Sequence, residues 1–108
     1  MQIIERINDD ELQLAVSGKL DTNTAPQLEA YINSKFFKVP VAIMHRLVLD
    51  LSGVSYISSA GVRVIVAAYK AASVSGSKNL KFFIKNPSDF CKQVFETIGI
   101  SDYLTFIK

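Results

Sequence analysis

The chain is organised around the segment Leu47–Lys70, in which a strand pattern is followed by a turn and then by a helix pattern. Residues 47–51 are apolar apart from one aspartate, which predicts a strand buried on both faces. The next six residues contain Gly53, where we expect a tight turn. From Ser58 onward, apolar side chains recur at helical spacing, at Val62, Ile65, Val66 and Tyr69. The segment therefore predicts a strand, a turn and a helix in succession.

Two hydroxyl groups stand where the predicted helix begins, on Ser58 and Ser59. Serine is a preferred N-cap, because its side-chain oxygen accepts a hydrogen bond from an unpaired N–H of the first turn. The same N–H groups and the helix dipole also favour a bound phosphate group. Two interpretations therefore stay open: the serines only cap the helix, or one of them also carries a phosphorylation signal.

The rest of the chain reads as alternating strands and helices. Residues 2–7 and 11–17 predict a hairpin, and Thr24 is expected to cap a helix that begins at Ala25–Pro26 and ends near Lys35. Residues 36–45 are assigned as a packed connection, 73–79 as a loop and 80–85 as a strand. Asn86 is expected to cap a last helix that Gly99 ends, and residues 103–107 predict a final strand. The order β-β-α-β-α-β-α-β indicates an α/β domain with a mixed sheet.

Length and composition set the broad class. A chain of 108 residues with 49% hydrophobic side chains fits one domain, residues 1–108. The single cysteine, Cys91, excludes an intrachain disulfide and favours a reducing compartment. No signal peptide is visible, and no apolar run approaches the roughly 20 residues of a membrane span. We therefore expect a cytoplasmic protein that does not insert into membranes.

The sequence lacks the residue combinations that most enzymes need. His45 is the only histidine, so a Ser–His or Cys–His pair would depend on it alone, and Cys91 reads as a small core residue. There is no histidine and cysteine cluster for a metal and no glycine-rich phosphate loop. A net charge of +2 and three scattered arginines give no nucleic-acid signature. We therefore expect no catalytic residues, metal or cofactor, and a protein partner becomes the leading possibility.

The segment Leu49–Val62, together with Val64–Val66, resembles the signature of STAS domains and is most similar to the bacterial anti-sigma factor antagonists. A second stretch, Val16–Ala25, is similar to the family's Gly-x-Leu-Asp loop and the helix start after it. The resemblance covers about residues 10–100. It implies a single STAS-like domain, a mixed sheet with its helices packed mainly on one face.

The resemblance also implies a function. Family members bind an anti-sigma factor that is also a serine kinase, and so regulate transcription indirectly. The kinase phosphorylates a serine at the start of the central helix, which breaks the partnership, and a phosphatase resets it. Laid on this sequence, the acceptor is Ser59. Ser58 stands where the family usually has aspartate, and Arg63 where a small residue is common.

The loop at residues 21–24 is expected near Ser59, because loops at the carboxyl ends of parallel strands gather beside helix starts. Arg63 follows Ser59 by one helical turn. We call the resulting set the predicted docking surface; it consists of Asp21, Thr22, Asn23, Thr24, Ser58, Ser59, Ala60, Gly61 and Arg63. We expect the protein to be a monomer or a weak dimer.

Two alternatives remain. The first keeps the fold but makes the protein a non-phosphorylated adaptor subunit of a transporter or of another signalling complex, which the serine at position 58 would suit. The second is an enzyme that uses His45, which the missing residue combinations make the weakest reading.

Overall fold

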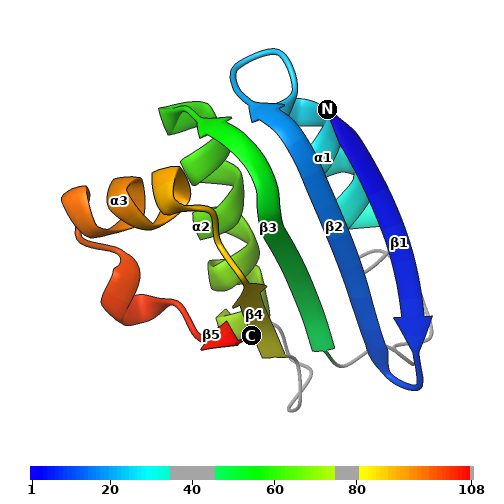
Figure 1. The fold of residues 1–108 in the computed structure, drawn as a ribbon. Helices are drawn as coiled ribbons and strands as arrows, with labels where there is room; N and C mark the ends of the chain where they lie inside the picture. The colour runs from blue at the N-terminus through cyan, green and yellow to red at the C-terminus, as the bar shows by residue number, and fades with distance from the viewer. Residues whose placement is uncertain (35–45, 75–80, 108) are drawn as a thin grey trace.

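The computed structural model describes residues 1–34, 46–74 and 81–107, without the side chains of 71–74. The connection expected over 36–45 and most of the loop expected over 73–79 lie outside these ranges. The elements of the described part (Figure 1) are β1 Gln2–Asn8, β2 Glu11–Leu20, α1 Ala25–Ile32, β3 Arg46–Ile57, α2 Ser59–Val74, β4 Lys81–Lys85, α3 Asp89–Thr97, the 3-10 helix η2 Ser101–Tyr103 and β5 Phe106–Ile107.

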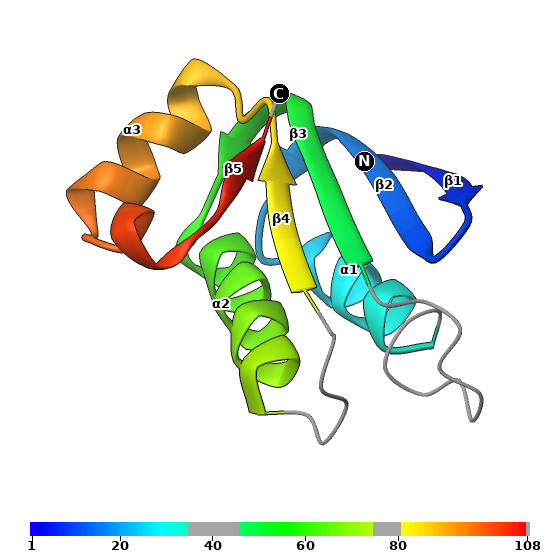
Figure 2. The same ribbon diagram turned by 90° about the horizontal axis from the view of Figure 1, so that it is seen from below.

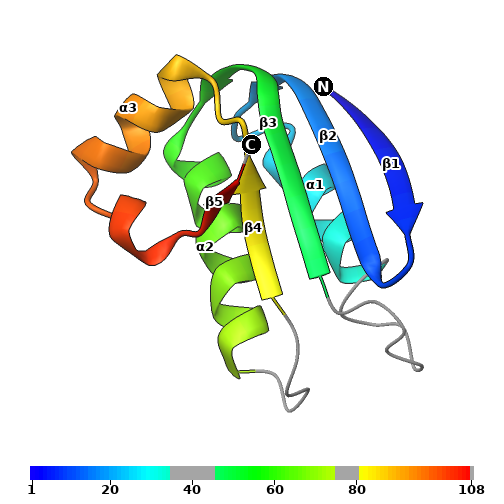
Figure 3. The same cartoon turned by 60° about the horizontal axis from the view of Figure 1, so that its bottom comes forward.

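The five strands form one mixed sheet in the order β1-β2-β3-β4-β5. The β1–β2 hairpin is antiparallel, and every later neighbouring pair is parallel. Helices α1 and α2 lie together on one face of the sheet (Figure 2). Helix α3 lies at the β5 side of the molecule and packs against β3 (Figure 3). The predicted fold class and element order are confirmed.

The core forms between the sheet and the two helices on its face. The predicted alternation in β2 is confirmed, because Leu12, Leu14 and Val16 are all buried. The neighbouring strand β3 is buried on both faces in its first half, where Val48 is as inaccessible as the leucines on either side of it. Helix α2 contributes Val62 and Ile65 from the predicted apolar stripe. Burial of these side chains is the main favourable term in folding.

The predicted turn at residues 52–57 is wrong, since β3 continues as a strand to Ile57. Strand β2 pairs with this whole stretch, up to the partners Leu20 and Ile57. Gly53 serves strand packing instead: a Cβ there would lie only 2.9 Å from the Cβ of Ser17. A glycine inside a strand can mark such a close backbone approach as well as a turn, and the pairing with β2 decides between them.

Two predicted caps differ in the structure. Thr24 precedes α1 as expected, but its hydroxyl does not cap that helix. Asn86 does not cap α3; it has a positive φ of 45°, and its N–H donates to the carbonyl of Ile107 at 3.1 Å. The actual N-cap of α3 is Ser88, whose Oγ accepts from the N–H of Cys91 at 3.3 Å. The positive φ of Asn86 is unlike the extended backbone of an N-cap, which Ser88 has, so the helix starts later than predicted.

The end of α3 agrees with the sequence. Gly99 has a φ of 78°, which suits glycine, and the Gly99 N–H donates to the carbonyl of Glu96 at 3.1 Å. The N–H of Ile100 donates to the carbonyl of Phe95 at 3.0 Å, which completes a Schellman motif. The final strand is shorter than predicted: residues 101–103 form η2, and β5 holds only two residues.

Candidate functional site

Ser58 is the N-cap of α2. Its carbonyl accepts from the N–H of Val62 at 2.9 Å, and its Oγ lies 3.5 Å from the N–H of Gly61. Its own N–H donates to the carbonyl of Leu20 at 2.9 Å, which ties the start of the helix to the end of β2. Ser58 is half-buried. The structure therefore confirms that Ser58 caps the helix, as its position in the sequence suggested.

Ser59, the first residue of α2, is exposed. Within the part of the chain that the structure describes, its hydroxyl makes no hydrogen bond. The helix start also presents N–H groups and a partial positive charge, both of which favour an anion. Of the two serines, Ser59 is therefore the one that can receive a phosphoryl group without breaking a bond that holds the fold.

Gly61 is buried beneath the start of α2 and has a steric role. A Cβ on this residue would lie 2.7 Å from the carbonyl oxygen of Leu20 and 2.9 Å from side-chain atoms of Leu20 and Ile57. Only glycine allows the helix to approach the strands this closely. Gly61 thus positions the predicted docking surface and has no side chain with which to contact a partner.

The loop at residues 21–24 is held by its own hydrogen bonds. The Asp21 carboxylate accepts from the N–H of Asn23 at 3.0 Å, and from the N–H and the hydroxyl of Thr24 at 3.2 and 3.3 Å. The Thr24 hydroxyl accepts from the N–H of Asp21 at 2.9 Å, and its single hydrogen is shared between the Asp21 carboxylate and the carbonyl of Lys19, which lies closer at 2.8 Å. Asp21 and Thr24 therefore shape the loop, while Thr22 and Asn23 are exposed at its tip.

The same contacts explain the acidity of Asp21. Partial desolvation acts to raise its pKa, but hydrogen bonds from the N–H groups of Asn23 and Thr24, from the Thr24 hydroxyl, and the charge of Lys19 outweigh it. The pKa of Asp21 is therefore lowered. The loop carries a negative charge at neutral pH as part of its structure.

The structure brings the two predicted segments together at one end of the sheet (Figure 1). Leu20 and Ile57 are paired, and the next residues along the chain are Asp21 and Ser58. Arg63 is exposed on α2, one turn after Ser59, and Ala60 is half-buried. The exposed members of the predicted docking surface are Thr22, Asn23, Ser59 and Arg63. Their part in binding a partner stays a prediction.

Two aromatic residues near this end were not predicted as surface residues. Tyr56 and Phe90 are 42% and 40% exposed, and their ring centroids lie 5.4 Å apart. Tyr56 lay in the expected turn, and Phe90 lay in the expected last helix. The core-facing stripe of α3 consists of Cys91 and Phe95, which are four residues apart, and Phe90 lies beside that stripe.

The remaining chemistry of the described residues is limited. Cys91 is buried as predicted, and burial raises the pKa of its thiol in spite of hydrogen bonds with Ser88, so the thiol stays protonated at neutral pH. The described residues contain no group of three or more histidine, cysteine or carboxylate side chains placed to hold a metal ion. Among them, no helix is both long and apolar enough to cross a membrane.

Fold and site define a small α/β domain that presents an exposed serine and a structured loop at the carboxyl end of its parallel strands. The family model described as the STAS domain matches residues 2–108. The anti-sigma-B factor antagonist of Listeria monocytogenes is 32% identical over 104 residues, which cover 96% of this chain and 84% of that protein. The chain therefore belongs to the STAS domain family, and the resemblance in the sequence is confirmed.

Solved structures share the fold. An anti-sigma factor antagonist from Mycobacterium paratuberculosis superposes with a TM-score of 0.80 at 24% identity, covering 97% of this chain and 83% of that one. The unphosphorylated anti-sigma factor antagonist SpoIIAA has a TM-score of 0.77 at 16% identity, covering 99% and 89%. Its phosphorylated form, from Bacillus, has a TM-score of 0.72. At these identities the likeness concerns the fold.

Proposed function

We propose that this protein is an anti-sigma factor antagonist that is regulated by phosphorylation of Ser59. In this function it binds an anti-sigma factor that is also a serine kinase, and phosphorylation by that kinase ends the binding. The observation that carries the proposal is the difference between the two serines: Ser58 caps α2, whereas the neighbouring Ser59 hydroxyl is exposed and makes no hydrogen bond within the described residues. The name of the Listeria relative supports the antagonist function over a transporter adaptor.

Phosphorylation of Ser59 would act on the surface more than on the fold. A phosphoserine adds about −1.5 to −2 units of charge at pH 7. The N-terminus of a helix tolerates this charge, because its N–H groups and dipole favour an anion. The added charge and bulk would lie beside the exposed loop tip at Thr22 and Asn23 and would displace a partner that docks there. The existence of a phosphorylated form of SpoIIAA is consistent with this mechanism.

The two departures from the family pattern fit this arrangement. The bond that joins Ser58 to Leu20 uses the backbone N–H, so it does not depend on an aspartate side chain at this position. Arg63 places an exposed cation one turn after Ser59, where an acidic group of the partner could pair with it. We assign Arg63 to partner recognition. The proposal has four further parts. A phosphatase restores Ser59, and the protein is located in the cytoplasm. It is a monomer or a weak dimer, and it catalyses no reaction itself.

The test is a phosphorylation assay with the cognate anti-sigma kinase and ATP. We expect the intact mass to rise by one phosphoryl group in the wild-type protein and to stay unchanged in Ser59→Ala. The variant Ser55→Ala, which removes an exposed serine of β3, is the matched control and should be phosphorylated normally. A wild-type protein that binds the kinase but gains no phosphoryl group would favour the non-phosphorylated adaptor.

A further inference from the structure

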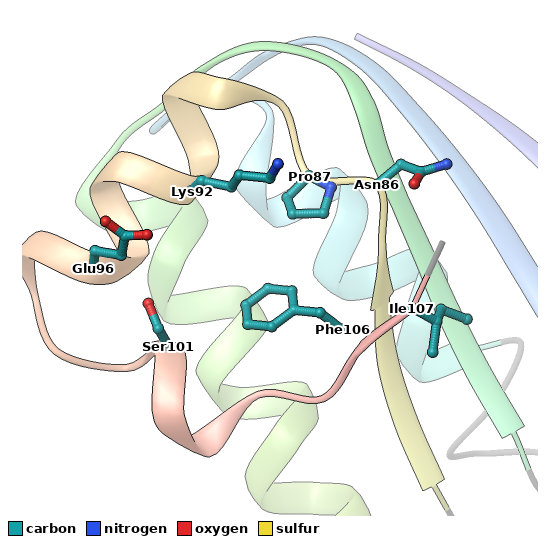
Figure 4. A pocket seen from close by; sticks show the side chains of 7 residues that line it. All are labelled: Asn86, Pro87, Lys92, Glu96, Ser101, Phe106 and Ile107. Atoms are coloured by element: carbon teal, nitrogen blue, oxygen red, sulfur yellow. The ribbon is translucent and has the colours of Figure 1, made fainter.

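A cavity of about 480 Å³ lies between α3 and the C-terminal residues (Figure 4). Its volume falls within the range of small-molecule sites. The walls come from the segment before α3, from α3 itself, from η2 and from β5. The lining residues are Asn86, Pro87, Lys92, Glu96, Ser101, Phe106 and Ile107.

The cavity has an apolar body and two polar ends of different character. The Phe106 ring extends into the space beneath α3 (Figure 4). The Lys92 side chain reaches toward Pro87 and Asn86 at one end, while Glu96 and Ser101 lie together at the other. Lys92 and Glu96 are four residues apart on α3, which places them on the same face of the helix. Neither side chain makes an ion pair or a hydrogen bond with another described residue.

Ser101 provides an independent observation. Its Oγ is buried and has no hydrogen-bond partner among the described residues. Buried hydroxyls in native proteins are nearly always paired, since an unpaired one loses its bond to water without replacement. The hydroxyl lies at the Glu96 end of the cavity (Figure 4). A group that enters this end with a hydrogen-bond donor can bond both the Ser101 oxygen and the Glu96 carboxylate.

We propose that this cavity binds a small bipolar organic molecule. Its carboxylate or similar anion pairs with Lys92 beside Asn86, and its ammonium or hydroxyl group donates to Glu96 and Ser101. An aromatic or aliphatic body between the two ends packs on Phe106. This site goes beyond the proposed function and does not depend on it, because none of its residues belongs to the predicted docking surface.

The experiment uses 4-(aminomethyl)benzoate as the probe and follows the amide signals of the whole chain in ¹H–¹⁵N correlation spectra. We expect saturable shifts centred on the residues that line the cavity. Benzoate and benzylamine each carry only one of the two charged ends, so each should bind about threefold or more weakly than the bipolar probe. Saturation at the cavity with this order of affinities supports the proposal.

Three variants locate the binding. Lys92→Gln should weaken binding of the probe and of benzoate about threefold while leaving that of benzylamine unchanged. Glu96→Gln should weaken binding of the probe and of benzylamine about threefold while leaving that of benzoate unchanged. Lys70→Gln, which removes an exposed lysine of α2, is the matched control and should change none of the affinities. Both cavity variants change side chains that are exposed on α3, so the dispersed spectrum of the folded protein should persist. Absence of saturable shifts at the cavity, or shifts that neither variant alters, would overturn the proposal.

Discussion

The backbone N–H of Ser58 donates to the carbonyl oxygen of Leu20 at 2.9 Å. This bond joins the last residue of β2 to the residue that caps α2, and it holds two segments together that are 38 positions apart in the sequence. The loop after Leu20 and the exposed Ser59 are therefore fixed relative to each other by the sheet itself. A partner that contacts both meets a preformed surface, which limits the entropy lost on binding.

Gly61→Ala should destabilise the protein by about 1–3 kcal/mol, because the added Cβ would lie 2.7 Å from the Leu20 carbonyl oxygen and force the helix away from the sheet. Urea unfolding measures the change. The sign of the change in the free energy of unfolding is informative, since a Gly→Ala substitution at an unhindered helix position usually stabilises a protein by about 0.4–1 kcal/mol. Stability equal to or above that of the wild type would contradict the close packing of α2 on β2.

Ser59→Glu should leave stability within about 1 kcal/mol of the wild type, because a negative charge at the first residue of α2 meets the positive end of the helix dipole. The same variant should lose most of its affinity for the anti-sigma kinase, which calorimetry can measure. Ser59→Gln, of similar size but uncharged, is the control that separates charge from bulk. Strong unfolding by Ser59→Glu would place the effect of phosphorylation on the fold instead of the surface.

Ser88→Ala should cost about 1–2 kcal/mol of stability. The Ser88 hydroxyl accepts from the N–H of Cys91 and donates to the carbonyl of Val54 at 2.7 Å, so its loss removes a helix cap and a bond between α3 and β3. Chemical denaturation gives the free energy of unfolding. Ser55→Ala, at an exposed position of β3, should change it by less than about 0.5 kcal/mol.

The lowered pKa of Asp21 predicts a pH dependence of stability. A carboxyl group whose pKa is lower in the folded state stabilises the protein above its unfolded pKa, near 3.8, and that stabilisation is lost as the pH falls through the lower folded value. Asp21→Asn should therefore be less stable than the wild type at neutral pH. In acid, where Asp21 of the wild type becomes protonated, the difference in stability between the two proteins should shrink. Thermal unfolding between neutral and strongly acidic pH tests this, with Asp9→Asn as the control. An equal difference at every pH would show that the Asp21 charge does not hold the loop.

The sequence by itself determined the features that depend on neighbours close in the chain. The alternation of Leu12, Leu14 and Val16, the helical stripe of α2 and the glycine that ends α3 follow from local periodicity and backbone freedom. The serine at the start of α2 is also set by the local sequence, and the motif around it resembles the STAS signature. The local sequence is enough to predict these features, because each of them depends on residues within a single segment of the chain.

Tertiary structure decided the features that depend on pairing between distant segments. Gly53 suits a turn, but β2 pairs with the stretch that contains it, so this stretch is a strand. Asn86 suits an N-cap, but in the folded chain it bonds to the end of β5 with a positive φ, and Ser88 caps α3 instead. The cavity beside α3 brings Lys92 and Phe106 together from two elements, which no spacing in the sequence indicates. A hydrogen bond or contact across the sheet outweighs a local preference of a few tenths of a kcal/mol to about one, and only the folded chain shows which contacts form.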